Sequence, residues 1–350
     1  MRSVLASTGM SSPPAPNTVN PFASTIDYTD YAPFAARARL IPYQPQADWR
    51  EELALVGRIL RVARREKLLL LNCTSDKLHP DLLAAGLIGF WPRRLRPVVV
   101  LMGAMWEPDR GLAGAIERLI MRLADRAIHR YLVQSRGELT LFPQLWHVSP
   151  AKMHFCPYFY TLTPREVADP PPPPADYVFA GGNSHRDYDA LIEAARRMPD
   201  RRFVIATSRL QNHTNLPPNV TAKPVPHPEF VRLMRASAVV VVPIERNMRR
   251  AAGQQTYLNA MWLGKPTVVN DTLGVRDHVE DGRTARVVEG SPTSYVHALQ
   301  WVFDASRRDE VRRLCETART VVGEQYTFEN HAACVLRVLD EAAASSGTGI

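Results

Sequence analysis

One stretch, residues 238–282, limits more than any other what this 350-residue chain can fold into. It opens with an apolar run, Ala238–Val242, which lacks the alternation of a half-exposed strand and is typical of a strand buried on both faces. Gly253 then precedes a short amphipathic segment, Gln254–Leu263, and a second apolar run follows at Thr267–Asn270. The order of strand, glycine loop, helix and strand predicts a parallel α/β unit.

The start of the predicted helix has the features of an anion-binding site. Backbone N–H groups in a first helical turn lack partners inside the helix and lie at the positive end of its dipole. Here those groups come from Gly253, Gln254, Gln255 and Thr256, and together they could hold a diphosphate. Many glycine turns in parallel α/β folds bind nothing, so the geometry alone leaves a purely structural role open.

Two segments carry a resemblance to a known family. Residues 253–282, GQQTYLNAMWLGKPTVVNDTLGVRDHVEDG, and residues 177–194, YVFAGGNSHRDYDALIEA, are similar to the C-terminal domain of group 1 glycosyltransferases with the GT-B fold. The shared features are a glycine loop, a helix ending in Ala260-Met261, the Gly264-Lys265-Pro266 turn, a valine-rich strand, and the run from Gly274-Val275 to Val279-Glu280-Asp281-Gly282. The resemblance extends over residues 176–340 and is loose in the N-terminal half.

The resemblance implies an α/β protein of GT-B architecture, with two Rossmann-like domains whose parallel sheets face a central cleft. The expected parts are an N-terminal acceptor-binding domain (1–169), a Pro-rich linker (170–175), a C-terminal nucleotide-sugar donor domain (176–325), and a C-terminal helix and tail (326–350). Pro170–Pro174 favour a stiff polyproline II connector. In this family a final helix, here Phe328–Ala343 with Thr327 as its N-cap, crosses back onto the N-terminal domain; local packing is the alternative.

The remaining apolar runs alternate with helix-like stretches, as a parallel sheet with crossover helices requires. The predicted strands are Ala38–Tyr43, Leu68–Asn72, Val98–Met102 and Tyr131–Val133, then Tyr177–Ala180, Phe203–Ala206, Val220–Ala222, Ala238–Val242, Thr267–Asn270 and Ala285–Val288. The clearest predicted helices of the N-terminal half are Trp49–Arg65 and Gly111–His129. Residues 1–25, rich in Pro, Ser and Ala, predict a mobile arm or an irregular first loop.

The resemblance also assigns donor-binding residues. Arg186 stands where the family usually has the lysine that contacts the donor diphosphate, and its planar guanidinium offers paired donors to phosphate. The predicted donor set is Gly181, Gly182, Arg186, Gly253, Gln254, Gln255, Thr256 and Asn259. Further candidates for phosphate contact are Arg246, Arg249 and Arg250. A solvated loop explains each of these three arginines more simply.

Two positions depart from the family pattern. Many retaining members carry one glutamate at the start of the glycine loop and another eight residues later, and the matching positions here are Ala251 and Asn259. Asn259 could still bond a ribose hydroxyl as an uncharged partner. Glu245 could supply a carboxylate from another point of the loop, and it is the candidate catalytic carboxylate. Retention or inversion of configuration stays open.

Acceptor-side candidates lie in loops that follow strands of the N-terminal half. Asp76 and His79 follow Leu68–Asn72, and either could serve as the base that takes the acceptor proton. For His79, an exposed loop position beside a proline is the simpler explanation. The predicted acceptor contacts, in the loop after Val98–Met102, are Gly103, Trp106 and Glu107.

Composition limits the other classes of protein to which the chain could belong. A hydrophobic content of 45% and a charged content of 22% are those of a globular protein, and no run approaches the roughly 18 apolar residues of a membrane span. The N-terminus lacks an apolar core long enough for a signal peptide, so we expect a cytoplasmic protein. The cysteines, Cys73, Cys156, Cys315 and Cys334, lack metal-like spacing and predict buried reduced thiols; we expect no metal and no cofactor.

The net charge of +8 is concentrated in residues 1–170, which carry 21 Lys and Arg against 15 Asp and Glu. A basic surface suits nucleotide sugars, anionic lipid or nucleic acid. Nucleic acid is disfavoured because the chain has no aromatic-interleaved basic stripe, zinc finger or RNA-binding signature. Residues 82–97, LLAAGLIGFWPRRLRP, pair an apolar run with three arginines and could rest on an anionic membrane, although an ordinary helix and loop is favoured.

Together these features predict a glycosyltransferase that moves a sugar from a nucleotide-diphosphate-sugar donor to an acceptor hydroxyl, in polysaccharide or glycolipid synthesis. The expected acceptor is a carbohydrate or a lipid-linked molecule, and peripheral membrane contact would suit the latter. Two alternatives remain. One is a non-catalytic GT-B module that binds a nucleotide sugar or a glycan, which the missing glutamates favour; the other is a nucleotide-sugar epimerase on the same fold.

Overall fold

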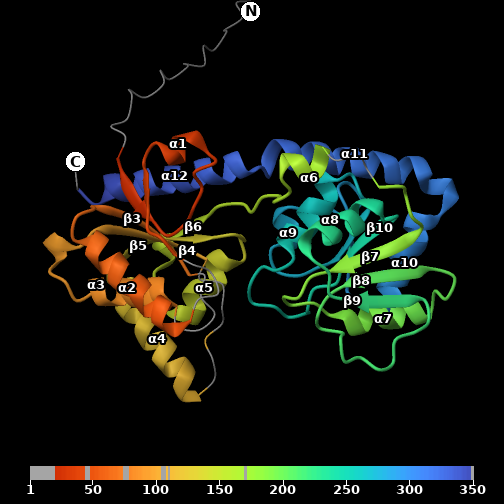
Figure 1. Ribbon diagram of the computed structural model, residues 1–350, viewed down its shortest axis with the longest axis horizontal. Helices are drawn as coiled ribbons and strands as arrows, with labels where there is room; N and C mark the ends of the chain where they lie inside the picture. Colours follow the sequence, from red (N-terminus) through yellow and green to blue (C-terminus); the bar gives the residue numbers. More distant parts are fainter. Residues whose placement is uncertain are drawn as a thin grey trace, which may run out of the picture.

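The computed structural model describes residues 20–43, 48–73, 79–103, 108, 111–168 and 172–347. These residues form two six-stranded parallel sheets, each covered by helices on both faces (Figure 1). The predicted α/β fold with two parallel sheets is therefore confirmed. Pro170 and Pro171 of the predicted linker lie outside the described residues, and the predicted domain boundaries stay predictions.

The strands of the N-terminal sheet are β1 (Phe22–Ser24), β2 (Ala38–Leu40), β3 (Leu68–Asn72), β4 (Val98–Met102), β5 (Ile128–Val133) and β6 (Met153–Phe155). Their order is β2-β1-β3-β4-β5-β6. β3 and β4 lie in the middle and are buried because their apolar side chains face helices on both sides. The expected arm or loop over residues 1–25 is wrong for β1, which pairs with β2 and β3. A strand of three residues is too short to stand out in the sequence.

The helices that precede the connecting segment are α1 (Ala32–Ala35), α2 (Trp49–Ala63), α3 (Pro80–Ile88), α4 (Gly111–Asp125) and α5 (Glu138–Trp146), with short 3₁₀ turns η1 (Arg93–Leu95) and η2 (Pro150–Lys152). Helix α2 is capped by Asp48, whose carboxylate accepts the N–H groups of Arg50 and Glu51. Helix α4 ends before the predicted His129, because Ile128 and His129 enter β5. Figure 1 shows α2, α3 and α4 together on one side of the N-terminal sheet.

The strands of the C-terminal sheet are β7 (Tyr177–Gly181), β8 (Arg202–Ala206), β9 (Val220–Lys223), β10 (Val239–Val242), β11 (Thr267–Asn270) and β12 (Arg286–Val288), in the order β12-β11-β10-β7-β8-β9. The helices are α6 (Pro164–Ala168), α7 (Tyr188–Arg196), α8 (His227–Ala236), α9 (Gln254–Trp262), α10 (Pro292–Phe303) and α11 (Arg308–Gln325), with 3₁₀ turns η3 (Val275–Asp277) and η4 (Ala305–Arg307). The four valines of β10 are fully buried, as the sequence predicted. Helices α8, α9 and α11 pack on one face of this sheet, and α7 and α10 on the other.

The last helix, α12 (Phe328–Ser345), returns to the N-terminal sheet. Its first turn is capped by Thr327, whose hydroxyl accepts the N–H of Asn330 at 3.1 Å. Apolar side chains of α12, among them Val335 and Leu339, pack with the side chains of β3 and β4 that face away from α2 and α3. Figure 1 shows α12 running across this sheet on the same side as α1. The crossing back that the resemblance implied is confirmed.

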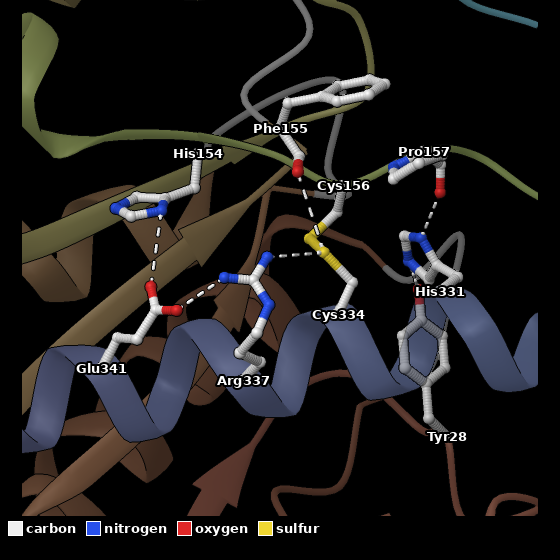
Figure 2. The surroundings of a disulfide bond; sticks show 9 residues. All are labelled: Tyr28, His154, Phe155, Cys156, Pro157, His331, Cys334, Arg337 and Glu341. Atoms are coloured by element: carbon white, nitrogen blue, oxygen red, sulfur yellow. Dashed lines mark hydrogen bonds and ion pairs between the residues drawn. A yellow bond between two sulfur atoms is a disulfide. The ribbon is translucent and has the colours of Figure 1, made fainter. Parts of the chain in front are cut away.

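A disulfide joins Cys156, just after β6, to Cys334 on α12, with the two Cα atoms 5.9 Å apart (Figure 2). Beside it, the His331 ring bonds the carbonyl oxygen of Pro157 at 2.7 Å and the Tyr28 hydroxyl at 3.1 Å. Burial lowers the pKa of His331 to about 4, so the neutral ring donates to Pro157 and accepts from Tyr28. The expectation of reduced thiols is wrong for this pair, because cysteines 178 residues apart show no pairing in the sequence. Cys73 and Cys315 are free thiols.

Candidate active site

A cleft of about 710 Å³ lies between the carboxyl ends of the two sheets. Its N-terminal wall consists of Tyr28, Asn72, Cys73, Met102, Gly103 and Gln134, to which the connecting segment adds Tyr158 and Leu162. Its C-terminal wall consists of residues 182–186, residues 250–256, Asn259, Val225 and the α8 residues His227, Phe230, Val231 and Met234. The structure therefore brings Arg186 and the glycine loop together in one cleft, although Arg186 and Gly253 are 67 residues apart in the sequence.

Arg186 is a buried cation in the wall of this cleft, with 6% of its surface exposed. Its guanidinium donates to the carbonyl oxygens of Gly181 at 3.2 Å and Ser184 at 2.7 Å, and to the Thr256 hydroxyl at 3.0 Å. A guanidinium has five N–H donors, so two can still serve a ligand. Burial lowers the pKa of Arg186, yet arginine stays charged at neutral pH. No described carboxylate lies in ion-pair contact with Arg186, although Glu245 interacts with it electrostatically, so an anion in the cleft would be attracted to this guanidinium.

Two glycines lie near this side chain, and one of them, Gly182, makes room for it. Gly182 has a φ of +111°, and a Cβ at that position would lie 3.0 Å from Nη2 of Arg186. A Cβ on Gly181 would lie 2.3 Å from the Phe230 ring. Gly181 is not among the described residues that line the cleft, but its carbonyl oxygen holds the Arg186 guanidinium.

The start of α9 forms the part of the wall beside Arg186. Gly253 precedes the helix in the left-handed conformation, with a φ of +78°, and a Cβ there would lie 2.8 Å from Cδ1 of Ile244. The turn directs the N–H groups of Gln254 and Gln255 out of the helix end, where no helical carbonyl can accept them. Thr256 links this end to Arg186 through its hydroxyl. Arg186 and residues 253–256 thus form one continuous part of the cleft wall.

Glu245, the candidate catalytic carboxylate, is not among the described residues that line the cleft. Its oxygens accept from Arg209 at 2.9 Å and from Nδ1 of His185 at 3.2 Å. Burial raises the pKa of Glu245, but hydrogen bonds from Arg209 and His185 outweigh it, and the net shift is downward. Nε2 of His185 in turn contacts the Arg250 guanidinium. Glu245 therefore contacts one residue of the cleft wall, His185, and His185 and Arg250 both line the cleft.

The two positions that depart from the family pattern, Ala251 and Asn259, both form hydrogen bonds. Ala251 donates its N–H to Oε1 of Glu138, across the two halves, at 2.9 Å. The Asn259 amide is held by Thr161: its oxygen accepts the Thr161 N–H at 2.8 Å, and its nitrogen donates to the Thr161 hydroxyl at 3.2 Å. The Asn259 amide nitrogen carries one further N–H, and Asn259 lines the cleft.

Glu138 is a carboxylate that the sequence analysis missed. It is buried at the start of α5, and its second oxygen accepts the N–H of Gln134 at 3.2 Å. Burial raises the pKa of Glu138, while the N–H groups of Ala251 and Gln134 act in the opposite direction. The Gln254 side chain adds a second link between the halves, donating to the Gln134 carbonyl at 2.8 Å. Nothing in the sequence signals a contact between residues 113 positions apart.

On the acceptor side, Gly103 lies in the cleft and His79 does not. His79 stands before the first turn of α3 with a φ of +46° and is not among the described residues that line the cleft. Asp76, Trp106 and Glu107 lie outside the described residues. Asn72 also lines the cleft and was not predicted, although its place at the end of β3 is a signal that could have revealed it.

Residues 175–305 match the model of the family described as glycosyl transferases group 1. This stretch belongs to that family. The group 1 domain contains Arg186, the glycine loop and α9, so it forms the C-terminal wall of the cleft. The resemblance seen in the sequence is thereby confirmed. No curated protein sequence matches the chain.

Solved structures share the fold over nearly the whole chain. Sucrose-phosphate synthase from Thermosynechococcus elongatus is 13% identical, with a TM-score of 0.65 and with 93% of this chain and 100% of that chain covered. HepE from Anabaena, in complex with UDP and glucose, is 14% identical, with a TM-score of 0.62 and 91% of each chain covered. A glycosyltransferase from Rickettsia africae is 11% identical, with a TM-score of 0.62 and with 92% and 90% covered. Together with the group 1 domain, these similarities show the GT-B fold.

Proposed function

We propose that this protein is a glycosyltransferase that moves a sugar from a nucleoside-diphosphate sugar to an acceptor hydroxyl. The observation that carries the proposal is the link between buried Arg186 and the first turn of α9, made through Thr256 in the cleft. This arrangement offers both a charge and backbone donors to a diphosphate. The solved complexes of HepE with UDP and with UDP-glucose support the choice of a nucleotide sugar.

The chemistry requires that negative charge be stabilised on the leaving diphosphate. As the bond from the anomeric carbon to the phosphate oxygen breaks, charge grows on that oxygen, and donors already in place lower the barrier. Arg186 and the N–H groups of Gln254 and Gln255 would fill this role. Arg250, oriented by His185, would add a second cation at the rim.

The acceptor would enter along the N-terminal wall. Asn72 and Gly103 line that wall at the ends of β3 and β4, facing the donor side. Asp76 and His79 remain the proposed bases, and Gly103, Trp106 and Glu107 the proposed acceptor contacts. A cytoplasmic setting and a role in polysaccharide or glycolipid synthesis belong to the same proposal.

A non-catalytic module that binds a nucleotide sugar is the second candidate. It is favoured by Ala251 and Asn259, since the first has no polar side chain and the second is bonded to Thr161. Such a module would keep the diphosphate site and lack turnover.

Incubation with a panel of UDP-, GDP- and TDP-sugars, followed by measurement of freed nucleotide, tests the proposal. Slow release of nucleotide, faster with an accepted glycan, supports a transferase. A rise in melting temperature with a nucleotide but no release supports the binding module. Isomerisation of the sugar without release would instead identify an epimerase. No rise in melting temperature with any of the three nucleoside diphosphates would remove the proposed function altogether.

A further inference from the structure

The N-terminal half carries large apolar side chains on its surface that its core does not explain. On α4, Leu112, Ile116 and Leu119 are 78%, 50% and 54% exposed. Their spacing of four and three residues places them on one face of the helix. A single exposed leucine is ordinary, but a row of three on one helical face marks a contact surface.

The end of α3 extends this surface. Most of the apolar run predicted to pair with the arginines is buried in the core, at Leu82, Ala84, Ala85 and Ile88, so it is an ordinary core helix. The exposed apolar residues of this segment are Leu87, Phe90 and Leu95. Gly89 brings the two helices to backbone contact, because a Cβ there would lie 2.4 Å from the carbonyl oxygen of Leu123. Figure 1 shows α3 and α4 side by side.

Arginines border these apolar side chains. Arg93 and Arg94 are exposed in η1, between Phe90 and Leu95, and residues 89–97 contain no acidic side chain. The charged residues of α4 and the turn after it are Arg118, Arg122, Arg126, Glu117 and Asp125. Asp125 is already paired with Lys152 at 2.8 Å. The combined surface is therefore apolar and positively charged.

We infer that this α3–α4 face, defined by Leu87, Phe90, Leu95, Leu112, Ile116 and Leu119 with the arginines around them, docks on the surface of an anionic lipid bilayer. The apolar side chains would enter the boundary between headgroups and acyl chains, and the arginines would pair with lipid phosphates. In the described part of the chain, every helix is too short or too polar to cross a bilayer, so the contact is peripheral.

A second copy of the chain fits this face less well. A symmetric contact would bring the same arginines of both copies together, and like charges repel. A bilayer surface has the opposite charge and needs no shape match.

Docking through this face would bring the cleft close to the bilayer. Gly103 at the end of β4 lines the cleft, and α4 begins at Gly111. The closeness of the cleft to a lipid-anchored acceptor matters only under the proposed function, whereas membrane docking itself does not depend on that function.

Co-sedimentation of the full chain with vesicles tests the inference. We expect binding to phosphatidylcholine vesicles that contain phosphatidylglycerol, none to phosphatidylcholine alone, and release by salt. The double variant Arg93→Gln/Arg94→Gln should bind roughly 10- to 30-fold more weakly, since each basic residue near an anionic surface adds to the affinity. Leu112→Ser/Ile116→Ser should lose binding as well. The matched control, Arg308→Gln/Arg313→Gln on α11, removes the same charge from the other half and should bind like the wild type.

Three results would overturn the inference: no binding to anionic vesicles, equal binding to neutral ones, or an equal loss in the control. A concentration-dependent dimer that Leu112→Ser/Ile116→Ser abolishes, seen by analytical ultracentrifugation, would also overturn it, because a second copy would then be the occupant. Circular dichroism melting shows whether each variant is folded. Nucleotide binding is measured separately, so failure of docking and failure of the donor site are distinguishable.

Discussion

The two walls of the cleft come from similar parallel sheets, yet their chemistry differs. The C-terminal wall presents a buried cation and the open end of a helix, and both suit a diphosphate. The N-terminal wall presents Asn72, Met102, Gly103 and Gln134, and the described residues of that wall carry no charge. Under the proposed function, the C-terminal wall would bind the donor diphosphate, and the other half would shape the space for the acceptor.

Hydrogen bonds also join the two halves beside the cleft. Glu138 of the N-terminal half holds Ala251 of the glycine loop, and Arg136 donates its N–H to Asp277 at 2.8 Å. The N-terminal half thus supplies carboxylate and backbone groups that position the donor loop. Its part in the proposed donor binding would be indirect, through the Ala251 N–H and the Gln254 side chain.

The strongest test of this division is Arg186→Ala. Charge-assisted hydrogen bonds contribute about 1.5–3 kcal/mol, so the affinity for UDP should fall roughly 10- to 100-fold by calorimetry. The control, Arg283→Ala, removes an arginine whose partner Glu280 is exposed, and it should leave UDP affinity unchanged. Unchanged affinity in Arg186→Ala would contradict the assignment of the diphosphate to the C-terminal wall.

The second prediction concerns a buried carboxyl in the N-terminal half. Burial raises the pKa of Asp81 to about 6, although hydrogen bonds from the Thr25 hydroxyl and the Asn72 N–H oppose this. Because its folded pKa lies above its unfolded value, the native state binds the proton more tightly. The free energy of unfolding should therefore fall as pH rises through about 6.

Asp81→Asn removes this titration and keeps an oxygen that can accept from Thr25 and Asn72. The difference in unfolding free energy between wild type and variant should change by about 1.4 kcal/mol between pH 5 and pH 8, in favour of the variant at pH 8. Urea unfolding at both pH values measures it. Parallel pH profiles for the two proteins would show that Asp81 does not titrate in this range.

A third test separates backbone strain from site geometry. Gly253→Ala and Gly264→Ala both place alanine in the left-handed region, at φ values of +78° and +68°, which costs about 1–2 kcal/mol. Only at Gly253 does the added Cβ approach another atom closely, Cδ1 of Ile244, whereas it meets nothing within 4 Å at Gly264. Both variants should melt at lower temperature, and only Gly253→Ala should bind UDP more weakly. Equal UDP affinities would show that the loop does not contact the diphosphate.

The contrast between local patterns and contacts between distant segments explains which elements the sequence could reveal. The strands β3, β4 and β11 and the start of α9 were predicted to the residue, because continuous apolar runs and a glycine before a helix depend on local physics. β1 was not predicted because a strand of three residues shows no periodicity. Helix α4 was predicted too long because its apolar pattern continues into β5.

The site followed the same rule. Arg186 was assigned from the resemblance and the glycine loop from a glycine that precedes a predicted helix, and both lie in the wall of the cleft. Glu138 and the Cys156–Cys334 disulfide depend on contacts between distant segments, which no spacing in the sequence encodes. Glu245 was chosen for its charge, and charge alone does not say which way a side chain points.

Substitution of Glu245 has the smallest expected effect, and it distinguishes a positioning role from a catalytic role for this carboxylate. If Glu245 acts by holding His185, and through it Arg250, Glu245→Ala should weaken UDP binding about two- to fivefold, the size of a partly exposed charge interaction. Glu245→Gln keeps an acceptor for His185 and should restore most of that loss. Glu289→Gln, which removes the exposed partner of Arg246, is the control and should match the wild type. If Glu245→Ala instead abolishes sugar transfer and leaves UDP affinity intact, the carboxylate reaches the reacting atoms, and the chemistry resides in the same wall as the donor.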